Sequence, residues 1–143
     1  MKTLLLDTNV LLRFITGEPA GQAKDVANLV LAAEAGKVRL AVLPMVLAEA
    51  VFVLTGFYEH PRNKVAGVLS HLISSQGFHS DEQDRMLHAL KLFGSGKLDF
   101  VDCYLAAASV CEGRLLVSFD RDLAKIHGIN LKKPGDWLLG EAR

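Results

Sequence analysis

Short apolar runs alternate with segments of helical length along this chain, and that alternation limits its possible folds more than any other feature. Five runs have the character of strands, the third and fifth only weakly: residues 3–6, 38–42, 77–79, 114–118 and 129–131. The segments between them have helical spacing or helix-start signals: residues 10–15, 21–35, 44–54, 61–72, 81–92, 100–111 and 120–126. Because strands that alternate with helices indicate βαβ units, we predict an α/β fold. Its expected form is a three-layer α/β/α sandwich with a mainly parallel sheet of about five strands.

Length and composition describe one globular domain. The 143 residues are predicted to form a single domain, 1–143, and a hydrophobic fraction of 50% argues against disorder. No apolar run reaches about 18 residues, the length of a membrane span, and the N-terminus lacks a signal peptide's cleavage region, so we expect a cytoplasmic protein. Cys103 and Cys111 lie roughly 12 Å apart along one predicted helix, too far for a disulfide, and are expected to be buried thiols.

Four carboxylates stand in apolar sequence, where an ionised group is costly. They are Asp7, Glu49, Asp102 and Asp120. If these groups are buried, each requires a cation or hydrogen-bond donors, and a shared divalent metal is the simplest partner. Asp7 and Asp120 each follow a predicted strand, and open α/β sheets bind ligands at the carboxyl ends of their strands. The two acids are therefore expected to lie together if their strands are neighbours.

Two of these acids also have structural interpretations that the sequence leaves open. Asp7 is a candidate N-cap for the helix over residues 10–15. Glu49 has apolar neighbours throughout residues 46–54 and no obvious polar face, so pairing with a cation such as Arg13 is the alternative to metal binding.

The other two acids lie where helices are predicted to start. Asp99 is the expected N-cap of the alanine-rich helix, with Asp102 at its third position, where a carboxylate favours the helix dipole and can still bind a metal. Asp120 is likewise a candidate cap, with Asp122 in the first turn. Oxygen ligands without convincing His or Cys companions favour Mg²⁺ or Mn²⁺ over zinc. The five histidines lack ligand spacing: His60, His71, His79, His88 and His127.

The acids and their neighbours resemble the PIN-domain ribonucleases, and within them the VapC-type toxins of toxin–antitoxin pairs. The resemblance rests on LLLDTNVLLR over residues 4–13, on Glu49, on DFVD over residues 99–102 and on LVSFDRD over residues 116–122. It covers nearly the whole chain. Cys103 stands where the family more often has alanine, a small replacement that suits the same tight helix.

The resemblance implies roles for individual residues and for a cofactor. It implies an acidic Mg²⁺ or Mn²⁺ site made of the four carboxylates, which hydrolyses RNA phosphodiester bonds with water as the nucleophile. The supporting positions are Asn9 and Ser118, with Asp122 as an additional acid. Whether one or two metals bind is left open.

RNA contacts have to come from local patches, since 16 Lys and Arg balance 16 Asp and Glu and leave no net charge. Arg13 and Arg121 adjoin the acids and are predicted to bind phosphates flanking the cleaved bond, unless they are solvated or pair with nearby acids. A basic turn over residues 60–64 is a further candidate patch. Single-stranded or looped RNA is the expected substrate, because its phosphates are accessible.

Partners and competing functions complete the prediction. Apolar surface on residues 45–54 and 64–73 exceeds what a short helical pair usually hides; it is either ordinary core or a site for an antitoxin segment or a second copy. The resemblance implies both an antitoxin and a homodimer. The alternatives to a toxin endoribonuclease are a PIN nuclease that processes RNA without an antitoxin, and a non-catalytic PIN-like module that binds RNA or protein.

Overall fold

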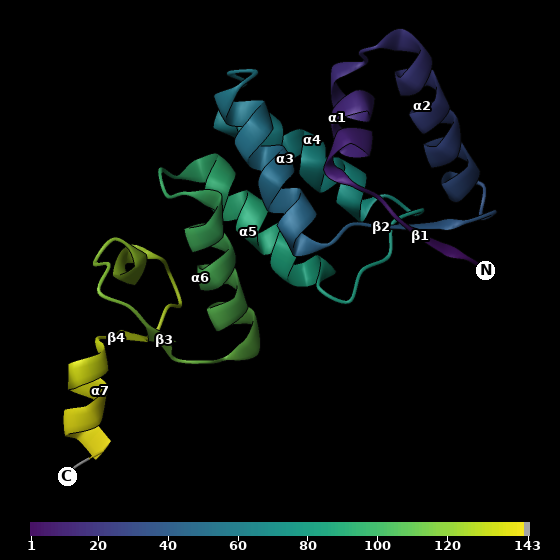
Figure 1. Ribbon diagram of the computed structural model, residues 1–143. Coiled ribbons are helices and arrows are strands. Elements are labelled where there is room, and N and C mark those ends of the chain that lie inside the picture. The colour runs from purple at the N-terminus through teal and green to yellow at the C-terminus, as the bar shows by residue number, and fades with distance from the viewer. Residues whose placement is uncertain (142–143) are drawn as a thin grey trace.

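The chain folds as an α/β protein with helices joined to short parallel strands (Figure 1). The computed structural model describes residues 1–141. Its strands are β1 (Thr3–Leu5), β2 (Arg39–Ala41), β3 (Leu116–Val117) and β4 (Leu131–Lys132). Its helices are α1 (Thr8–Thr16), α2 (Ala20–Glu34), α3 (Pro44–Gly56), α4 (Arg62–Ser74), α5 (Gln83–Ser95), α6 (Phe100–Glu112) and α7 (Pro134–Glu141), with a short 3₁₀ turn at Leu123–Lys125.

The first sheet consists of β1 and β2, paired in parallel with Leu4 opposite Leu40. Phe78 forms a single parallel bridge with Leu40 on the side of β2 opposite β1, so Leu40 is paired with Leu4 on one side and Phe78 on the other. The Leu40 N–H donates to the Gly77 carbonyl at 2.9 Å, and the His79 N–H donates to the Leu40 carbonyl at 2.9 Å. The weak strand signal over residues 77–79 is thus realised as one bridge.

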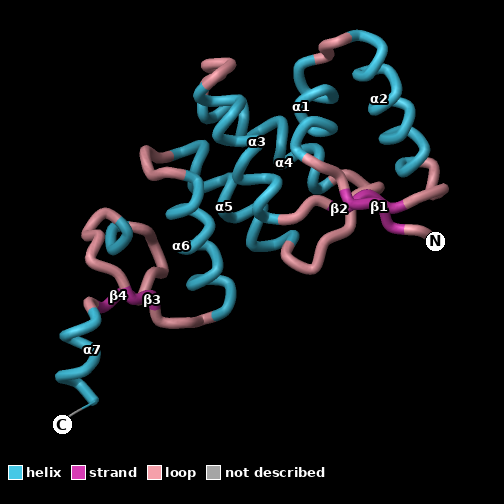
Figure 2. The backbone as a smooth tube through the Cα atoms, viewed as in Figure 1, coloured by secondary structure: helices cyan, strands magenta, loops and turns pink. Residues whose placement is uncertain are grey.

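The second sheet, β3 with β4, lies apart from the first. In Figures 1 and 2, β1 and β3 are on opposite sides of the molecule, and α5 and α6 lie between them. Leu116 of β3 and Leu123 pack with Ala106 of α6 in a small apolar cluster of their own. The two sheets are therefore separate units within the described residues.

This arrangement corrects the expected single sheet of about five strands and its three-layer sandwich. The local pattern located the strands, but pairing β1 with β3 requires contacts between segments more than a hundred residues apart. In the structure, the cluster with Ala106 holds β3 on α6 instead of beside β1.

Only one face of the first sheet is covered. Leu40 and Val42 belong to the main core, as do Leu11 of α1, Leu47 of α3 and others from α4 and α5. On the opposite face, Leu5 keeps 66% of its surface exposed. The first sheet is consequently a two-layer structure with an uncovered side.

One helix begins where the sequence predicts, and other element boundaries differ from those expected. Pro44 begins α3, as a residue without a donor N–H should. Glu82 rather than Asp81 precedes α5, and its side chain makes no cap hydrogen bond. The helix expected over residues 120–126 shrinks to the 3₁₀ turn, and α7 was not expected. No helix in the described part of the chain combines the length and hydrophobicity that a membrane crossing needs.

Gly77 is a position where a side chain has no room. A Cβ there would lie 2.6 Å from Ala33 Cβ and 3.0 Å from the Ala33 carbonyl carbon, so the backbone would have to move. We expect Gly77→Ala to lower the free energy of unfolding by about 1–3 kcal/mol, measured by urea denaturation. Gly67→Ala in α4 is the matched control, because its Cβ would meet nothing within 4 Å and should add about 0.5–1 kcal/mol. Equal stability of the two variants would contradict the close approach.

Candidate functional site

Asp7 lies at the carboxyl end of β1 and caps α1. Its Oδ1 accepts a hydrogen bond from the Val10 N–H at 3.0 Å, which confirms the N-cap interpretation. The carboxylate is exposed and makes no salt bridge among the described residues. Asn9, in the first turn of α1, is exposed as well. Capping therefore engages one oxygen of Asp7 and leaves the other open to a ligand.

Glu49 lies on an exposed position of α3, which corrects the expectation that its apolar neighbours would bury it. Arg13 does not pair with it: the Arg13 Nε donates instead to Gln22 Oε1 at 2.8 Å. The structural alternative for Glu49, an ion pair with Arg13, is therefore wrong. Its carboxylate faces solvent with no cation beside it in the described chain.

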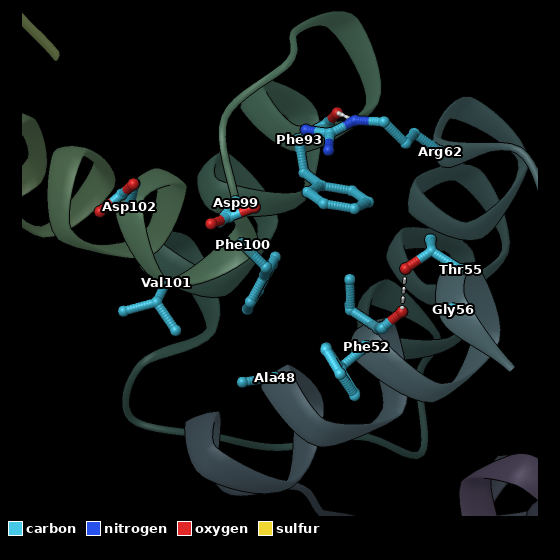
Figure 3. A pocket seen from close by; sticks show the side chains of 11 residues that line it. Ala48, Phe52, Thr55, Gly56, Arg62, Phe93, Asp99, Phe100, Val101 and Asp102 are labelled. Carbon is cyan, nitrogen blue, oxygen red and sulfur yellow. Dashed lines mark hydrogen bonds between the residues drawn. The ribbon is translucent and has the colours of Figure 1, made fainter. Parts of the chain in front are cut away.

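Asp102 lies in the first turn of α6 and is the one acid of the four that is partly buried. Burial raises the pKa of the Asp102 carboxyl, and the negative charges of Asp120 and then Asp99 raise it further. Asp99 occupies the N-cap position as expected, although its side chain makes no cap hydrogen bond. These three carboxylates thus form an acidic cluster where α6 begins; Figure 3 shows Asp99 and Asp102.

Asp120 is held by its neighbours in a turn after β3. Its N–H donates to Ser118 Oγ at 3.0 Å, and its Oδ1 accepts from the Asp122 N–H at 2.9 Å. Asp122 in turn pairs with Lys125 Nζ at 3.2 Å. Ser118 therefore orients Asp120, whereas Asp122 already has a cation of its own.

The structure brings together only part of the predicted metal site. Asp102 and Asp120 interact, but neither Asp7 nor Glu49 contributes to the shifted pKa of Asp102. Across residues 1–141, no three His, Cys, Asp or Glu side chains are grouped closely enough to hold a metal ion. The carboxylate donors suit Mg²⁺ or Mn²⁺ chemically. Within one chain, however, the expected set of four is divided.

A cavity of about 450 Å³ opens beside the acidic cluster, between α3 and the start of α6 (Figure 3). Apolar side chains line most of it, among them Ala48, Phe52 and Val101, and Asp99 and Asp102 stand at its edge. Phe52 is 76% exposed, so the α3 wall is an accessible apolar surface. The cavity therefore has an apolar wall on α3 and the carboxylates of Asp99 and Asp102 on the side of α6.

Arg62 is a structural residue that the sequence assigned to a basic surface patch. Its guanidinium donates to the carbonyls of Phe93, at 3.1 Å, and Leu98, and it stacks over the Phe93 ring with its Cζ 3.8 Å from the centroid. These contacts hold the loop that leads into Asp99 and α6. No local signal pointed to this role, because Leu98 is 36 residues away in the chain.

Arg121, the second arginine predicted to contact RNA, is exposed next to Asp120 and forms no ion pair in the described part of the chain.

Both cysteines are free; Cys103 is buried, whereas Cys111 is exposed, contrary to the expectation of two buried thiols. Burial raises the pKa of the Cys103 thiol to about 11, so it is a poor nucleophile.

The raised pKa of Asp102 has a consequence for stability. A carboxyl whose pKa is higher in the folded chain binds its proton more tightly there, so the folded state loses stability as pH rises from 3.8 through the raised pKa. We expect Asp102→Asn, in chelator-treated protein, to raise the Tm by about 1–3 °C at neutral pH. The gain should vanish below the ordinary pKa of 3.8. Asp25→Asn on α2 controls for the loss of a surface charge, and an equal gain from both variants would refute the prediction.

A family model described as the PIN domain matches residues 4–129, which include all four acids and Arg121. No curated protein matches the chain.

Proposed function

The chain belongs to the PIN-domain family, whose members are generally nucleases, and from this premise we propose that it is a metal-dependent endoribonuclease. The observation that supports the proposal is the acidic cluster at the start of α6: the charge of Asp120 raises the pKa of Asp102, and neither acid has a salt bridge within residues 1–141. Such uncompensated negative charge favours a bound divalent metal. Asp7, which follows β1, also lies within the residues that the family model matches. Only its Oδ1 is used in capping α1, so the other carboxylate oxygen can bind a ligand.

Metal binding is assigned to the four carboxylates Asp7, Glu49, Asp102 and Asp120. When bound, Mg²⁺ or Mn²⁺ lowers the pKa of water and so supplies a nucleophile for phosphodiester hydrolysis. Ser118 orients Asp120 through the hydrogen bond from the Asp120 N–H. Asn9 is assigned a supporting position next to Asp7, and Asp122 is the additional acid of the predicted set, although its bond to Lys125 makes it the weakest candidate.

RNA binding is assigned to cations beside the acids. Arg121 lies next to Asp120, forms no ion pair within residues 1–141, and is suited to a phosphate next to the cleaved bond. Arg13 bonds Gln22 through Nε only, which leaves its terminal nitrogens for the same purpose. The substrate class is single-stranded or looped RNA, whose backbone reaches a surface site.

We assign the biological role of a toxin that forms a homodimer and is held inactive by an antitoxin in the cytoplasm. Support for a protein partner comes from two exposed apolar side chains on α3, Met45 and Phe52, of which Phe52 lines the cavity. Finding a small upstream reading frame with a DNA-binding half would support the toxin role. Its absence favours a PIN nuclease that processes RNA alone.

Purified full-length protein tests the enzymatic proposal. We expect cleavage of single-stranded RNA with Mg²⁺ or Mn²⁺, loss of cleavage in excess chelator, and recovery when metal is restored. Calorimetric titration with Mn²⁺ should detect binding that Asp102→Asn weakens at least tenfold, since one charged ligand is lost. Cleavage that persists in chelator would refute the metal dependence. Absence of both Mn²⁺ binding and cleavage would favour the non-catalytic PIN-like module.

A further inference from the structure

Strand β1 has one open edge. The Leu6 N–H bonds to the Ala41 carbonyl and the Lys2 carbonyl accepts from Arg39, both at 3.0 Å, so these alternate residues face β2. The N–H and C=O groups of Thr3 and Leu5 therefore point to the opposite edge. No described strand pairs with that edge.

Strand β3 has an open edge of the same kind. The N–H groups of Leu116 and Ser118 donate to the carbonyls of Asn130, at 2.8 Å, and Lys132, at 3.1 Å. The N–H and C=O groups of Val117 consequently point away from β4, and no described strand accepts them. Each two-stranded sheet is parallel, so both open edges suit a parallel neighbour.

Both edges also expose apolar side chains. Leu5 is 66% exposed on β1, and on the other edge Val117 is 50% and Phe119 is 77% exposed. Neither strand contains the lysine, proline or bulge that commonly protects an edge from another chain. Both edges therefore combine free backbone groups with exposed apolar side chains, and neither has a strand partner within residues 1–141.

The same chain does not readily join its own two edges. Leu116 and Leu123 are buried against Ala106 of α6, and α5 and α6 lie between β1 and β3 (Figure 1). Moving β3 to β1 within one chain would break this apolar cluster. A second copy can bring its β3 to the free edge of β1 with the cluster intact.

We propose that two copies of this chain exchange their open edges: β1 of each copy pairs in parallel with β3 of the other. The proposed register places Leu5 opposite the partner's Ser118. The backbone of Leu5 then forms hydrogen bonds with the backbone of the partner's Val117 and the partner's Phe119, and Asp7 lies opposite the partner's Asp120. The exchange is reciprocal, so a twofold axis relates the two contacts and the assembly closes as a dimer.

This register also covers the exposed side chains. Parallel neighbours that lie opposite one another point to the same face of a sheet. The partner's Leu116 would face the uncovered side, together with Leu5, and bring the helix α6 on which it packs. The partner's Val117 would face the buried side with Leu4. The two-layer sheet thereby gains a third layer.

The dimer also accounts for the division of the acids, a consequence that rests on the proposed function. Asp7 would come from one copy, and Asp102 and Asp120 from the other. Each nuclease site is then made of two chains, and neither chain completes it alone. This is consistent with the lack of a three-residue metal group among residues 1–141 of a single copy.

Thiol cross-linking tests the strand exchange without relying on activity. Leu5→Cys with Ser118→Cys is made in a Cys111→Ser background, where the remaining Cys103 is buried. Mild oxidation should yield a covalent dimer, and mixing the two single-cysteine proteins should yield the same dimer. Arg39→Cys with Ser118→Cys is the matched control: β2 is separated from the exchanged strand by β1, so this variant should form no covalent dimer.

Two outcomes would overturn the exchange. A disulfide formed within one chain would show that the chain closes on itself, and an absence of any disulfide would show that these edges do not meet. Val117→Lys provides a second measurement in the otherwise native protein. A lysine at the contact should raise the dimer Kd at least tenfold in sedimentation experiments, and an unchanged Kd would count against the interface.

Complementation then examines the shared site. Asp7→Asn and Asp120→Asn proteins are inactive alone in this scheme, but a mixed dimer contains one site with both acids. Equal mixing should restore about a quarter of the wild-type cleavage rate, since half of the dimers are mixed and each has one intact site of two. Cross-linked dimers without restored cleavage would refute the shared site. If the wild type itself fails to cleave, the proposed function is wrong while the cross-linking result still decides the exchange.

Discussion

Replacing Asp7 by Asn is expected to lower the rate of RNA cleavage by a factor on the order of 10² to 10³, the size typical of removing one stabilising electrostatic contact from a catalytic site. The substitution removes a charge that holds the metal in the proposed site. It should leave folding intact, because asparagine caps a helix as well as aspartate does, and the hydrogen bond from the Val10 N–H to the side chain can persist. Cleavage is measured on single-stranded RNA with Mn²⁺, and folding by the Tm.

The Asp7 series separates capping from metal binding. Asp7→Ala loses the cap as well and should cost about 1 kcal/mol of stability beyond the Asn variant, with the same loss of cleavage. Asp25→Asn, an exposed acid of α2, is the matched control and should cleave like the wild type. Wild-type cleavage by Asp7→Asn would eliminate Asp7 from the mechanism.

Truncation of Leu40 to Ala is expected to cause the largest loss of stability, about 3–5 kcal/mol. Leu40 is completely buried in β2 and lies between Leu4 and Phe78, the residues that it bridges. Removing its side chain leaves a cavity at the centre of the first sheet, where the backbone has little freedom to collapse. Urea denaturation monitored by circular dichroism measures the change.

Leu31→Ala is the control for Leu40→Ala. Leu31 is 61% exposed on α2, so its truncation should change the free energy of unfolding by less than about 1 kcal/mol. A comparable loss in both variants would contradict the placement of Leu40 in the core. Because neither residue lies at the acids, any cleavage defect in Leu40→Ala should follow the fraction unfolded.

The sequence predicted local features well where a short segment carried its own signal. The strand before Asp7, the helix that starts at Pro44 and the helix that follows Asp99 were all located to within a few residues. Capping of α1 by Asp7 was also visible, because the capping carboxylate and the N–H group that donates to it lie three positions apart. In contrast, burial was overestimated for Glu49, since apolar neighbours along a helix do not show which side of that helix faces solvent.

The sequence by itself determined the helices, the strand positions and the ordered motif within the segment that the PIN family model matches, since these depend on neighbouring residues or on their order along the chain. Only the tertiary structure decided which elements meet. It separated β3 from β1 and brought Asp120 close enough for its charge to raise the pKa of Asp102. It also placed the Arg62 guanidinium where it donates to the Leu98 carbonyl. The physical reason is that packing between distant segments depends on how whole surfaces fit. The small cluster of Leu116, Leu123 and Ala106 holds the second sheet on α6, and no local pattern states that choice.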